Sequence, residues 1–285
     1  MFRNLSPGAV GISGSMREVM ELAREHGFAG IDLDVGEAMK IAEETSLGDV
    51  QQMLDDYALE PGGFGLPVDF RRDEERFEEG LARLPAIAET AAALGCYRCP
   101  TWITPASDAL PFDENFELHR RRLKRCAEVL GEYHIRLGLE FVGPKTSRAG
   151  RKHEFIWDMA GMLKLIDAIG TGNVGLLLDC WHWYTSYGTL DDLKKLTNDD
   201  VVYVHVNDAP AGVPVDEQID SVRRLPGETG VIDIAGFLQA LDDIGYDGPV
   251  TPEPFVPSLR EMGNEKAAQV VGESMAKIWS LAGLP

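Results

Sequence analysis

Four metal-capable side chains each end an apolar run in the second half of the chain. Glu140 follows Leu-Gly-Leu, Asp179 follows three leucines, His205 follows Val-Tyr-Val, and Glu253 follows Val-Thr-Pro. A single carboxylate at such a point is more often a helix cap, and a single histidine there is more often structural. Four in succession indicate one shared site, because a dication would relieve the repulsion among three carboxylates.

The ligand set of this site indicates which ion it would bind. Three carboxylates and one imidazole form a mixed oxygen and nitrogen shell, which differs from the thiolate shell of a structural zinc site. Such a shell suits Mn²⁺ or Mg²⁺, and also Co²⁺. The sequence therefore predicts one divalent ion, with Mn²⁺ preferred, bound by Glu140, Asp179, His205 and Glu253.

These side chains need a scaffold that brings four strand ends together. Short apolar runs alternate with longer amphipathic segments, which is typical of a parallel sheet with crossover helices. Strands are expected at residues 9–13, 30–34, 62–66, 97–102, 135–141, 174–179, 201–206 and 249–253. Helices are expected at residues 16–26, 46–57, 73–94, 115–134, 159–169, 190–196, 234–244 and 263–281.

Eight such units predict an α/β fold, a (β/α)8 TIM barrel, formed by one domain over residues 1–285. Neighbouring strands of a barrel lie roughly 4.8 Å apart, and active sites form at the carboxyl ends of the strands. The four side chains can therefore converge at the mouth of the barrel.

The composition of the chain argues against some classes of binding partner. The net charge of −20 argues against a nucleic-acid partner, which would need clustered Lys and Arg. No apolar run reaches the length of a membrane helix, and the first residues lack a signal-peptide pattern, so we expect a cytoplasmic protein with no membrane partner. Cys96 and Cys99 form a C-x-x-C without a second pair, which favours ordinary reduced thiols.

Loops and aromatic residues near the expected strand ends are candidates for substrate binding. The stretch 207–230 is long for a loop in a compact domain, and such loops are usually functional. Lys145 begins a basic stretch, 145–152, that could bind a phosphate or carboxylate of the substrate or could simply be solvated. Trp102 and Phe64 could stack on a sugar face or could pack between loops.

The order Glu, Asp, His, Glu on the last four strands resembles the xylose isomerase-like TIM barrels, the sugar phosphate isomerase/epimerase superfamily. Segments 178–183, 204–208, 223–230 and 245–254 are similar to its local motifs. The resemblance implies that the four residues are metal ligands and that Glu140 and Glu253 are also the acid/base carboxylates. It further implies that His182 and Arg223 contact the substrate.

The resemblance implies a metal-dependent sugar isomerase or epimerase that forms a cis-enediolate from a ketose or related keto-sugar, and a possible homo-oligomer. In the ketose 3-epimerases a second Glu stands six residues after the first, where this chain has Thr146. A metal-dependent lyase or dehydratase acting on a keto-sugar or keto-inositol is the alternative, because it shares the first proton abstraction. A non-catalytic sugar-binding or partner subunit is a more remote alternative.

Overall fold

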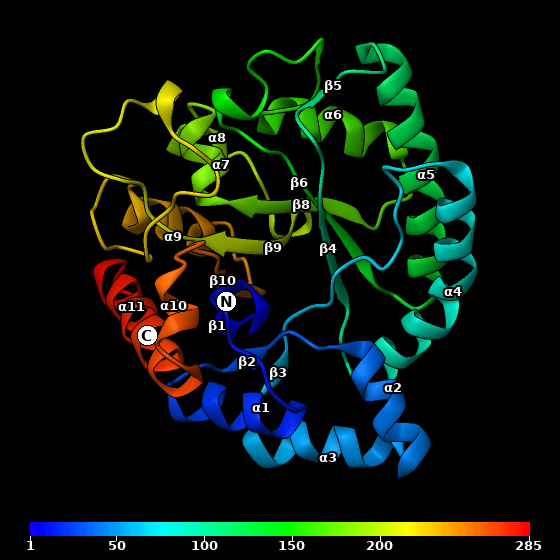
Figure 1. Cartoon of the computed structure of the whole chain (residues 1–285), viewed down its shortest axis with the longest axis vertical. Coiled ribbons are helices and arrows are strands. Elements are labelled where there is room, and N and C mark those ends of the chain that lie inside the picture. Colours follow the sequence, from blue (N-terminus) through cyan, green and yellow to red (C-terminus); the bar gives the residue numbers. More distant parts are fainter.

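The computed structural model describes residues 1–285 and has eight parallel strands surrounded by helices (Figure 1). The strands are β1 (Phe2–Leu5), β2 (Gly30–Ile31), β3 (Glu60–Pro61), β4 (Arg98–Trp102), β6 (Arg136–Glu140), β8 (Val174–Asp179), β9 (Val201–Val206) and β10 (Pro249–Pro252). Hydrogen-bonded neighbours follow the order β3-β2-β1-β10-β9-β8-β6-β4. Strands β6, β8 and β9 are almost entirely buried, as expected for parallel strands covered on both faces.

The two ends of this strand order are also joined. The amides of Phe64 and Leu66, just after β3, donate to the carbonyls of Arg98 and Pro100 in β4, each over 3.1 Å. These bonds connect β3 with β4 and close the sheet, so the predicted TIM barrel is confirmed.

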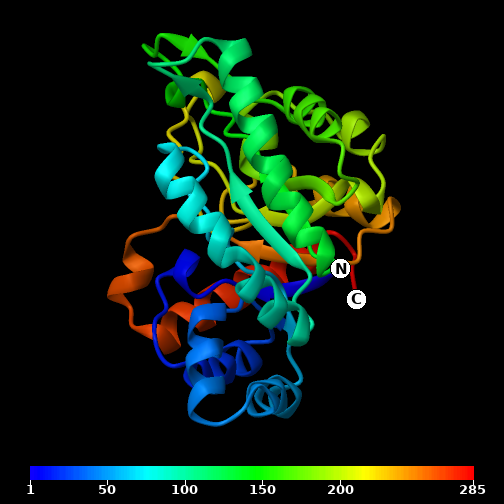
Figure 2. The ribbon, with the colours of Figure 1, turned by 90° about the vertical axis from the view of Figure 1, so that its right-hand side faces the viewer.

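Helices cover the outside of the barrel, and α4 and α5 lie side by side in front of the strands in the second view (Figure 2). The longer helices are α1 (Met16–Glu25), α2 (Val35–Glu44), α3 (Leu47–Tyr57), α4 (Glu74–Ala93), α5 (Phe112–Glu132), α6 (Met159–Ile169), α9 (Ile234–Asp243) and α11 (Asn264–Leu281). One cluster of 68 buried apolar residues joins strands and helices, so they share a core. None of the helices is long and apolar enough to cross a membrane.

Short elements complete the connections between the strands and the longer helices. They are α7 (Cys180–Thr185), α8 (Leu190–Leu193), α10 (Ser258–Glu261), the antiparallel pair β5 (Ala106–Ser107) and β7 (His153–Glu154), and the 3-10 turns η1 (Gly8–Val10), η2 (Lys145–Ser147), η3 (Asn198–Asp200) and η4 (Val215–Glu217). The turns η2 and η4 pack against each other, which brings the loop after β6 to the loop after β9.

The first strand was predicted wrongly at residues 9–13. The chain forms β1 earlier, and residues 8–10 form the turn η1. β1 contains Arg3 and Asn4, so it does not read as an apolar run. Asn4 is nevertheless fully buried, with polar partners on β9 and β10 and just after β2. Its burial depends on contacts distant in sequence, which no local pattern reveals.

Helix α2 was not predicted, because only three residues, 32–34, separate it from β2, and they were expected to be part of the strand. The side chain of Asp34 accepts a hydrogen bond from the amide of Glu37 and caps the helix. Residue 34, expected at the end of a strand, is therefore the start of a helix. The expected strand 62–66 likewise lies just past β3, where Phe64 and Leu66 make the closing bonds to β4.

Candidate metal centre

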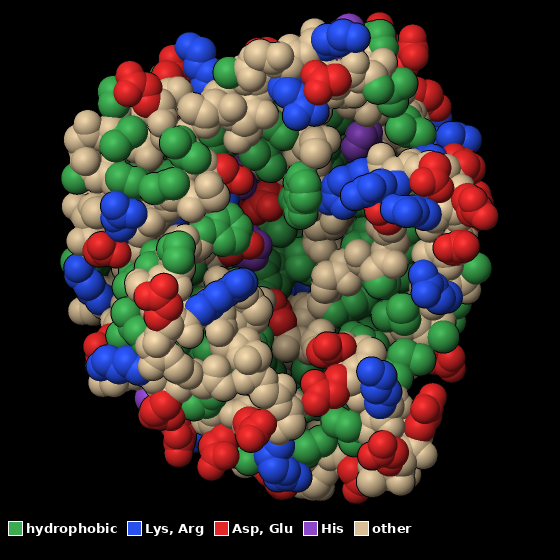
Figure 3. Space-filling model, in the orientation of Figure 1, with side chains coloured by type: hydrophobic (Ala, Val, Ile, Leu, Met, Phe, Trp, Pro, Cys, Tyr) green, Lys and Arg blue, Asp and Glu red, His purple; other side chains and the backbone are tan.

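Four neighbouring strands carry the predicted ligands to one place at the mouth of the barrel. Glu140 ends β6, Asp179 ends β8, His205 is the penultimate residue of β9, and Glu253 follows β10 directly. The register pairs His205 with Asp179 on one side and with Thr251 on the other, which brings the strand ends level. The face in Figure 3 is hollowed at its centre, and acidic and histidine side chains lie inside the hollow.

The geometry of the four side chains suits one small cation. Each offers a ligand atom, and these four atoms all lie within 4.8 Å of one another. Nδ1 of His205 is 3.2 Å from a carboxylate oxygen of Glu140 and 3.5 Å from one of Glu253. Ligand atoms about 2.0–2.4 Å from a common centre are at most about 4.8 Å apart, so the donors fit a divalent ion.

Asp179 is held in place by groups behind it. Its Oδ1 accepts hydrogen bonds from the backbone N–H of Trp181 (2.7 Å) and from Nδ2 of Asn207 (3.1 Å). The first bond also caps α7, which begins at the next residue. Because Oδ1 is fixed in this way, Oδ2 is directed toward Arg223 and the other three side chains. Hydrogen bonds from outer partners commonly orient metal ligands in this manner.

Arg223 reaches this centre from the loop after β9, and its guanidinium is buried. Its Nη1 donates to Oδ2 of Asp179 over 2.8 Å and to Oε2 of Glu253 over 3.0 Å. Its Nη2 donates to Oδ1 of Asp220 over 2.8 Å. Arg223 therefore offsets part of the negative charge of the predicted ligands, a role that the sequence did not indicate.

His182 lies beside Arg223, three residues beyond Asp179. Its Nδ1 accepts a hydrogen bond from the backbone N–H of Gly143 over 3.2 Å, and its Nε2 lies 3.2 Å from Nη2 of Arg223. Burial lowers the pKa of His182 to about 4, with Asp179 opposing this shift, so the ring is neutral near pH 7. Its Nε2 is the atom directed toward the cavity side of the cluster.

The charges in the cluster act on one another. Burial raises the pKa of the Glu140 carboxyl, and the hydrogen bond with His205 opposes that shift. Burial also disfavours the charged form of His205. The carboxylates of Glu253, Glu140 and Asp179 outweigh this effect, so the pKa of His205 is raised. Burial raises and Arg223 lowers the pKa of Asp179, and the net result is a lowered pKa. The centre is thus rich in negative charge and favours cations.

A cavity of about 400 Å³ opens over the cluster. Its lining residues are Trp102, Pro105, Glu140, Val142, Ser147, His182, Asp220, Arg223, Glu253 and Phe255. Five of the predicted site residues therefore share one cavity wall, including the aromatic Trp102. The guanidinium of Arg71 covers the ring of Trp102 at 4.3 Å from the ring centroid, which fixes the orientation of the indole.

Lys145 is not brought into this cavity. Its Nζ pairs with Asp216 over 2.7 Å, and the side chain is largely exposed. Two of the three other cations of the basic stretch also have partners, since Arg148 donates to the carbonyl of Gly143 and Arg151 pairs with Asp108. None of the four cations lines the cavity, although Ser147 of the same stretch does.

Sequence reasoning missed two acidic residues near the centre. Asp220 contacts Arg223 and lines the cavity, and it lies in the loop 207–230 that was expected to be functional. Asp32 follows β2 and lies in a buried polar network with Tyr203. The rule that located Glu140, a polar side chain at the end of an apolar strand, applies equally to Asp32.

The fold and the site define a (β/α)8 barrel with a carboxylate–histidine centre at the carboxyl ends of its strands. Residues 20–278 match the xylose isomerase-like TIM barrel family, and the chain belongs to this family. The inosose isomerase of Bacillus velezensis is 24% identical over 278 residues, which cover 94% of this chain and 93% of that protein. The 3-dehydroshikimate dehydratase of Pseudomonas aeruginosa is 28% identical over 257 residues, 90% of this chain and 38% of that protein.

Solved structures give the same fold. A xylose isomerase domain protein from Alicyclobacillus acidocaldarius superposes with a TM-score of 0.87 and 32% identity, over 99% of each chain. The IOLI protein, solved with a bound zinc atom, superposes with a TM-score of 0.81 and 21% identity, over 98% of each chain. At 21% identity, the second likeness concerns the fold alone.

Proposed function

We propose that this chain is a divalent-metal-dependent isomerase or epimerase acting on a ketose, or on a related keto-sugar or keto-cyclitol. The observation that carries the proposal is the convergence of four ligand atoms within 4.8 Å beneath an open cavity. The isomerases among the relatives, such as inosose isomerase, support the same class of reaction.

Glu140, Asp179, His205 and Glu253 would hold the ion. When bound, a divalent ion would polarise the substrate carbonyl and acidify the adjacent C–H bond. Asp179 and His205 serve as ligands only, because Asp179 is engaged by Trp181 and Arg223. The two glutamates each have a second oxygen that can meet the substrate.

Glu140 and Glu253 would transfer the protons. They extend from β6 and β10, which are separated in the sheet by β8 and β9, so they approach the cavity from different sides. One carboxylate takes the proton next to the carbonyl, and the same or the other carboxylate returns it. Return to the same carbon from the opposite side inverts that carbon, and return to the neighbouring carbon moves the carbonyl.

His182 and Arg223 would orient the substrate. Both are buried at the cavity wall, and both carry N–H groups or a ring nitrogen that can bond to sugar oxygens. Trp102 also lines the cavity and offers an apolar ring surface, which suits the C–H face of a sugar. These contacts would hold the reacting carbon between the two glutamates.

A dehydratase is the second candidate. The 3-dehydroshikimate dehydratase relative is 28% identical, and Thr146 replaces the second Glu that ketose 3-epimerases carry. Water loss begins with the same proton abstraction, so the same four ligands and one glutamate base would serve it.

The test is an NMR experiment in D₂O with the Mn²⁺-loaded protein. The probes are an inosose, D-fructose and 3-dehydroshikimate. Deuterium entering at the carbon beside the carbonyl, together with an isomer or epimer, is the expected result. Loss of water from a probe would instead support the dehydratase, and no exchange or conversion of any probe would contradict both candidates.

A further inference from the structure

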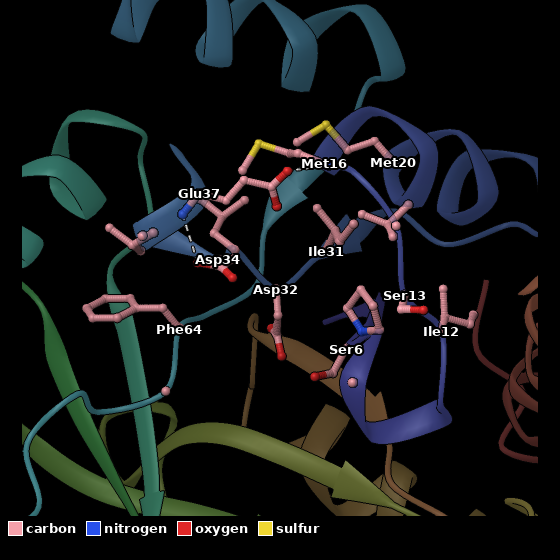
Figure 4. Close-up of a pocket in the computed structure, with 18 of the residues that line it drawn as sticks. Ser6, Ile12, Ser13, Met16, Met20, Ile31, Asp32, Asp34, Glu37 and Phe64 are labelled. Carbon is pink, nitrogen blue, oxygen red and sulfur yellow. Dashed lines mark hydrogen bonds between the residues drawn. The ribbon is translucent and has the colours of Figure 1, made fainter. Parts of the chain in front are cut away.

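A second cavity, of about 620 Å³, lies at the carboxyl ends of β1, β2 and β3 (Figure 4). Its walls are formed by the loop after β1, the start of α1, the end of β2 and the segment after β3. Met16, Met20, Ile31 and Phe64 give it apolar surface, and Ser6 and Asp32 face each other on one side. The proposed reaction uses none of these residues.

The charged residues that line this cavity are all acidic. Its 20 lining residues include three carboxylates but no Lys, Arg or His. Two of the carboxylates have local structural roles, since Asp34 caps α2 and Glu37 accepts a hydrogen bond from the amide of Met16 over 2.9 Å. Asp32 has no such role, because none of its bonds caps a helix.

Asp32 is held from one side by a buried polar network. Its Oδ1 accepts hydrogen bonds from Nδ2 of Asn4 (2.9 Å) and from the hydroxyl of Tyr203 (2.7 Å), which is also 2.8 Å from Oδ2. The hydroxyl of Thr251 donates to that of Tyr203 over 2.7 Å. A carboxylate has about four acceptor positions, so Asp32 keeps acceptor capacity on its cavity side.

Two glycines lie opposite this network, and their lack of side chains leaves room for it. A Cβ atom at Gly62 would lie 2.2 Å from Oδ1 of Asn4, and one at Gly63 would lie 2.9 Å from the ring of Tyr203. Two consecutive glycines after β3 therefore let Asn4 and Tyr203 approach the backbone. The side chain of Asp32, which follows β2 directly, is thus held by groups on the strands β1 and β9.

The network connects the second cavity with the metal centre. Tyr203 and His205 both point into the barrel from β9, and their rings meet edge to face at 5.4 Å between centroids. One aromatic ring thus separates the Asp32 carboxylate from a predicted metal ligand. β2 lies two strands from β10 in the sheet, roughly 10 Å along the rim, which is within the reach of a six-carbon sugar.

We propose that this second cavity binds the end of the substrate remote from the metal, and that Asp32 selects an uncharged, hydroxyl-bearing end by accepting a hydrogen bond from it. The inference rests on the proposed function for the placement of the reacting end. A phosphate or carboxylate would face three carboxylates without a cation among the lining residues, and such like-charge pairing is costly. The apolar wall suits the C–H groups between the hydroxyls.

The experiment compares three ligands that differ only at the remote end: D-fructose, D-fructose 6-phosphate and 6-amino-6-deoxy-D-fructose. Their binding to the Mn²⁺-loaded protein is measured by calorimetry, with inorganic phosphate as the control for direct binding to the metal ion. We expect the 6-phosphate to bind at least about tenfold more weakly than D-fructose, and the amine to bind at least as tightly as D-fructose.

Asp32→Asn tests the residue itself. The asparagine keeps the shape of the aspartate side chain. When its amide oxygen accepts the hydrogen bond from Tyr203, its NH₂ group, a donor, faces the cavity instead of a carboxylate oxygen. The affinity for D-fructose should therefore fall about tenfold. Asp34→Asn is the matched control: it removes the same charge from the same cavity, retains the helix cap, and should leave D-fructose affinity within about twofold. Thermal unfolding of each variant verifies that it is folded.

The outcomes separate this inference from the proposed function. Equal or tighter binding of the 6-phosphate, unchanged D-fructose binding by Asp32→Asn, or failure of all three ligands to bind would overturn the inference. If the expected order of binding holds but no probe exchanges hydrogen with D₂O, the cavity assignment stands and the proposed reaction fails.

Discussion

Nη1 of Arg223 lies 2.8 Å from Oδ2 of Asp179, and both side chains are almost fully buried. The same nitrogen lies 3.0 Å from Oε2 of Glu253, so one guanidinium joins two of the predicted metal ligands. Removing a buried partner leaves charges uncompensated, which typically costs about 3–5 kcal/mol. Arg223 therefore stabilises the cluster of predicted ligands and also lines the cavity above it.

Arg223→Ala should lower the free energy of unfolding of the metal-free protein by about 3 kcal/mol. Added Mn²⁺ should recover part of this loss, because the ion would then neutralise Asp179 and Glu253. Thermal or urea unfolding with EDTA and with Mn²⁺ measures both effects. Arg224→Ala, at the neighbouring and partly exposed arginine, is the control and should change stability by less than about 0.5 kcal/mol. Equal effects of the two variants would refute the account of Arg223.

Glu140→Gln and Glu253→Gln should each reduce kcat by about 10²–10⁴, since each removes a proton-transferring carboxylate while preserving its shape. Both should retain some metal, because the amide oxygen can still act as a ligand. In an epimerase with two bases, one of the two variants should still exchange substrate hydrogen with D₂O without inverting the carbon. Near-normal conversion by both variants would place the base elsewhere, with His182 the next candidate.

Asp208 stabilises the loop that carries Asp220 and Arg223. Its buried carboxylate accepts hydrogen bonds from four backbone N–H groups, those of Ala209, Thr229, Gly230 and Ile232. Asp208→Ala should cost about 3 kcal/mol or more by leaving these donors without a partner, and should raise the KM. Faster amide exchange over residues 209–230 would report the loosened loop.

The control for Asp208 is Asp216→Asn on the same loop, where the carboxylate is more exposed and pairs with Lys145. Its effect on the free energy of unfolding should be small, because solvent screens an exposed ion pair. A smaller effect from Asp208→Ala than from Asp216→Asn would contradict this interpretation of the loop.

His119 makes stability dependent on pH. Burial lowers its pKa to about 4, and its ring contacts Phe70 and Phe155 while Nδ1–H donates to the carbonyl of Asn115. The unfolded chain takes up the proton near pH 6.5, and the folded chain only near pH 4. The contribution of the neutral ring is therefore complete above pH 6.5 and is lost progressively as the pH falls from 6.5 to 4, by about 3 kcal/mol in total.

His119→Gln removes this titration and keeps a donor for the Asn115 carbonyl. Urea unfolding of the wild type and the variant at several pH values between 7 and 4 measures the difference. The wild type should lose about 3 kcal/mol more than the variant over this range. His134→Asn, at an exposed histidine with φ of 59°, is the control and should follow the wild type. Parallel curves for His119→Gln and the wild type would contradict the assignment.

The barrel, and the convergence of the four predicted ligands at its mouth, could be predicted from the sequence because both depend on local patterns. Apolar runs reveal buried parallel strands, and a polar residue at the end of such a run points to the mouth of the barrel. The same reasoning failed for β1, where the buried Nδ2 of Asn4 finds its acceptors on Asp32, Tyr203 and Thr251, which are distant in sequence. It also could not show that Arg223 joins Asp179 to Glu253, since that contact spans a long loop.

Titration of the metal-free protein with Mn²⁺, followed by deuterium uptake from D₂O into a keto-sugar or inosose probe, tests the central claim most directly. We predict no deuterium uptake in EDTA and maximal uptake at one Mn²⁺ per chain. Asp179→Ala and His205→Ala should each lose both tight Mn²⁺ binding and deuterium uptake. Full uptake by protein that contains no metal, or unchanged Mn²⁺ binding by these two variants, would contradict it.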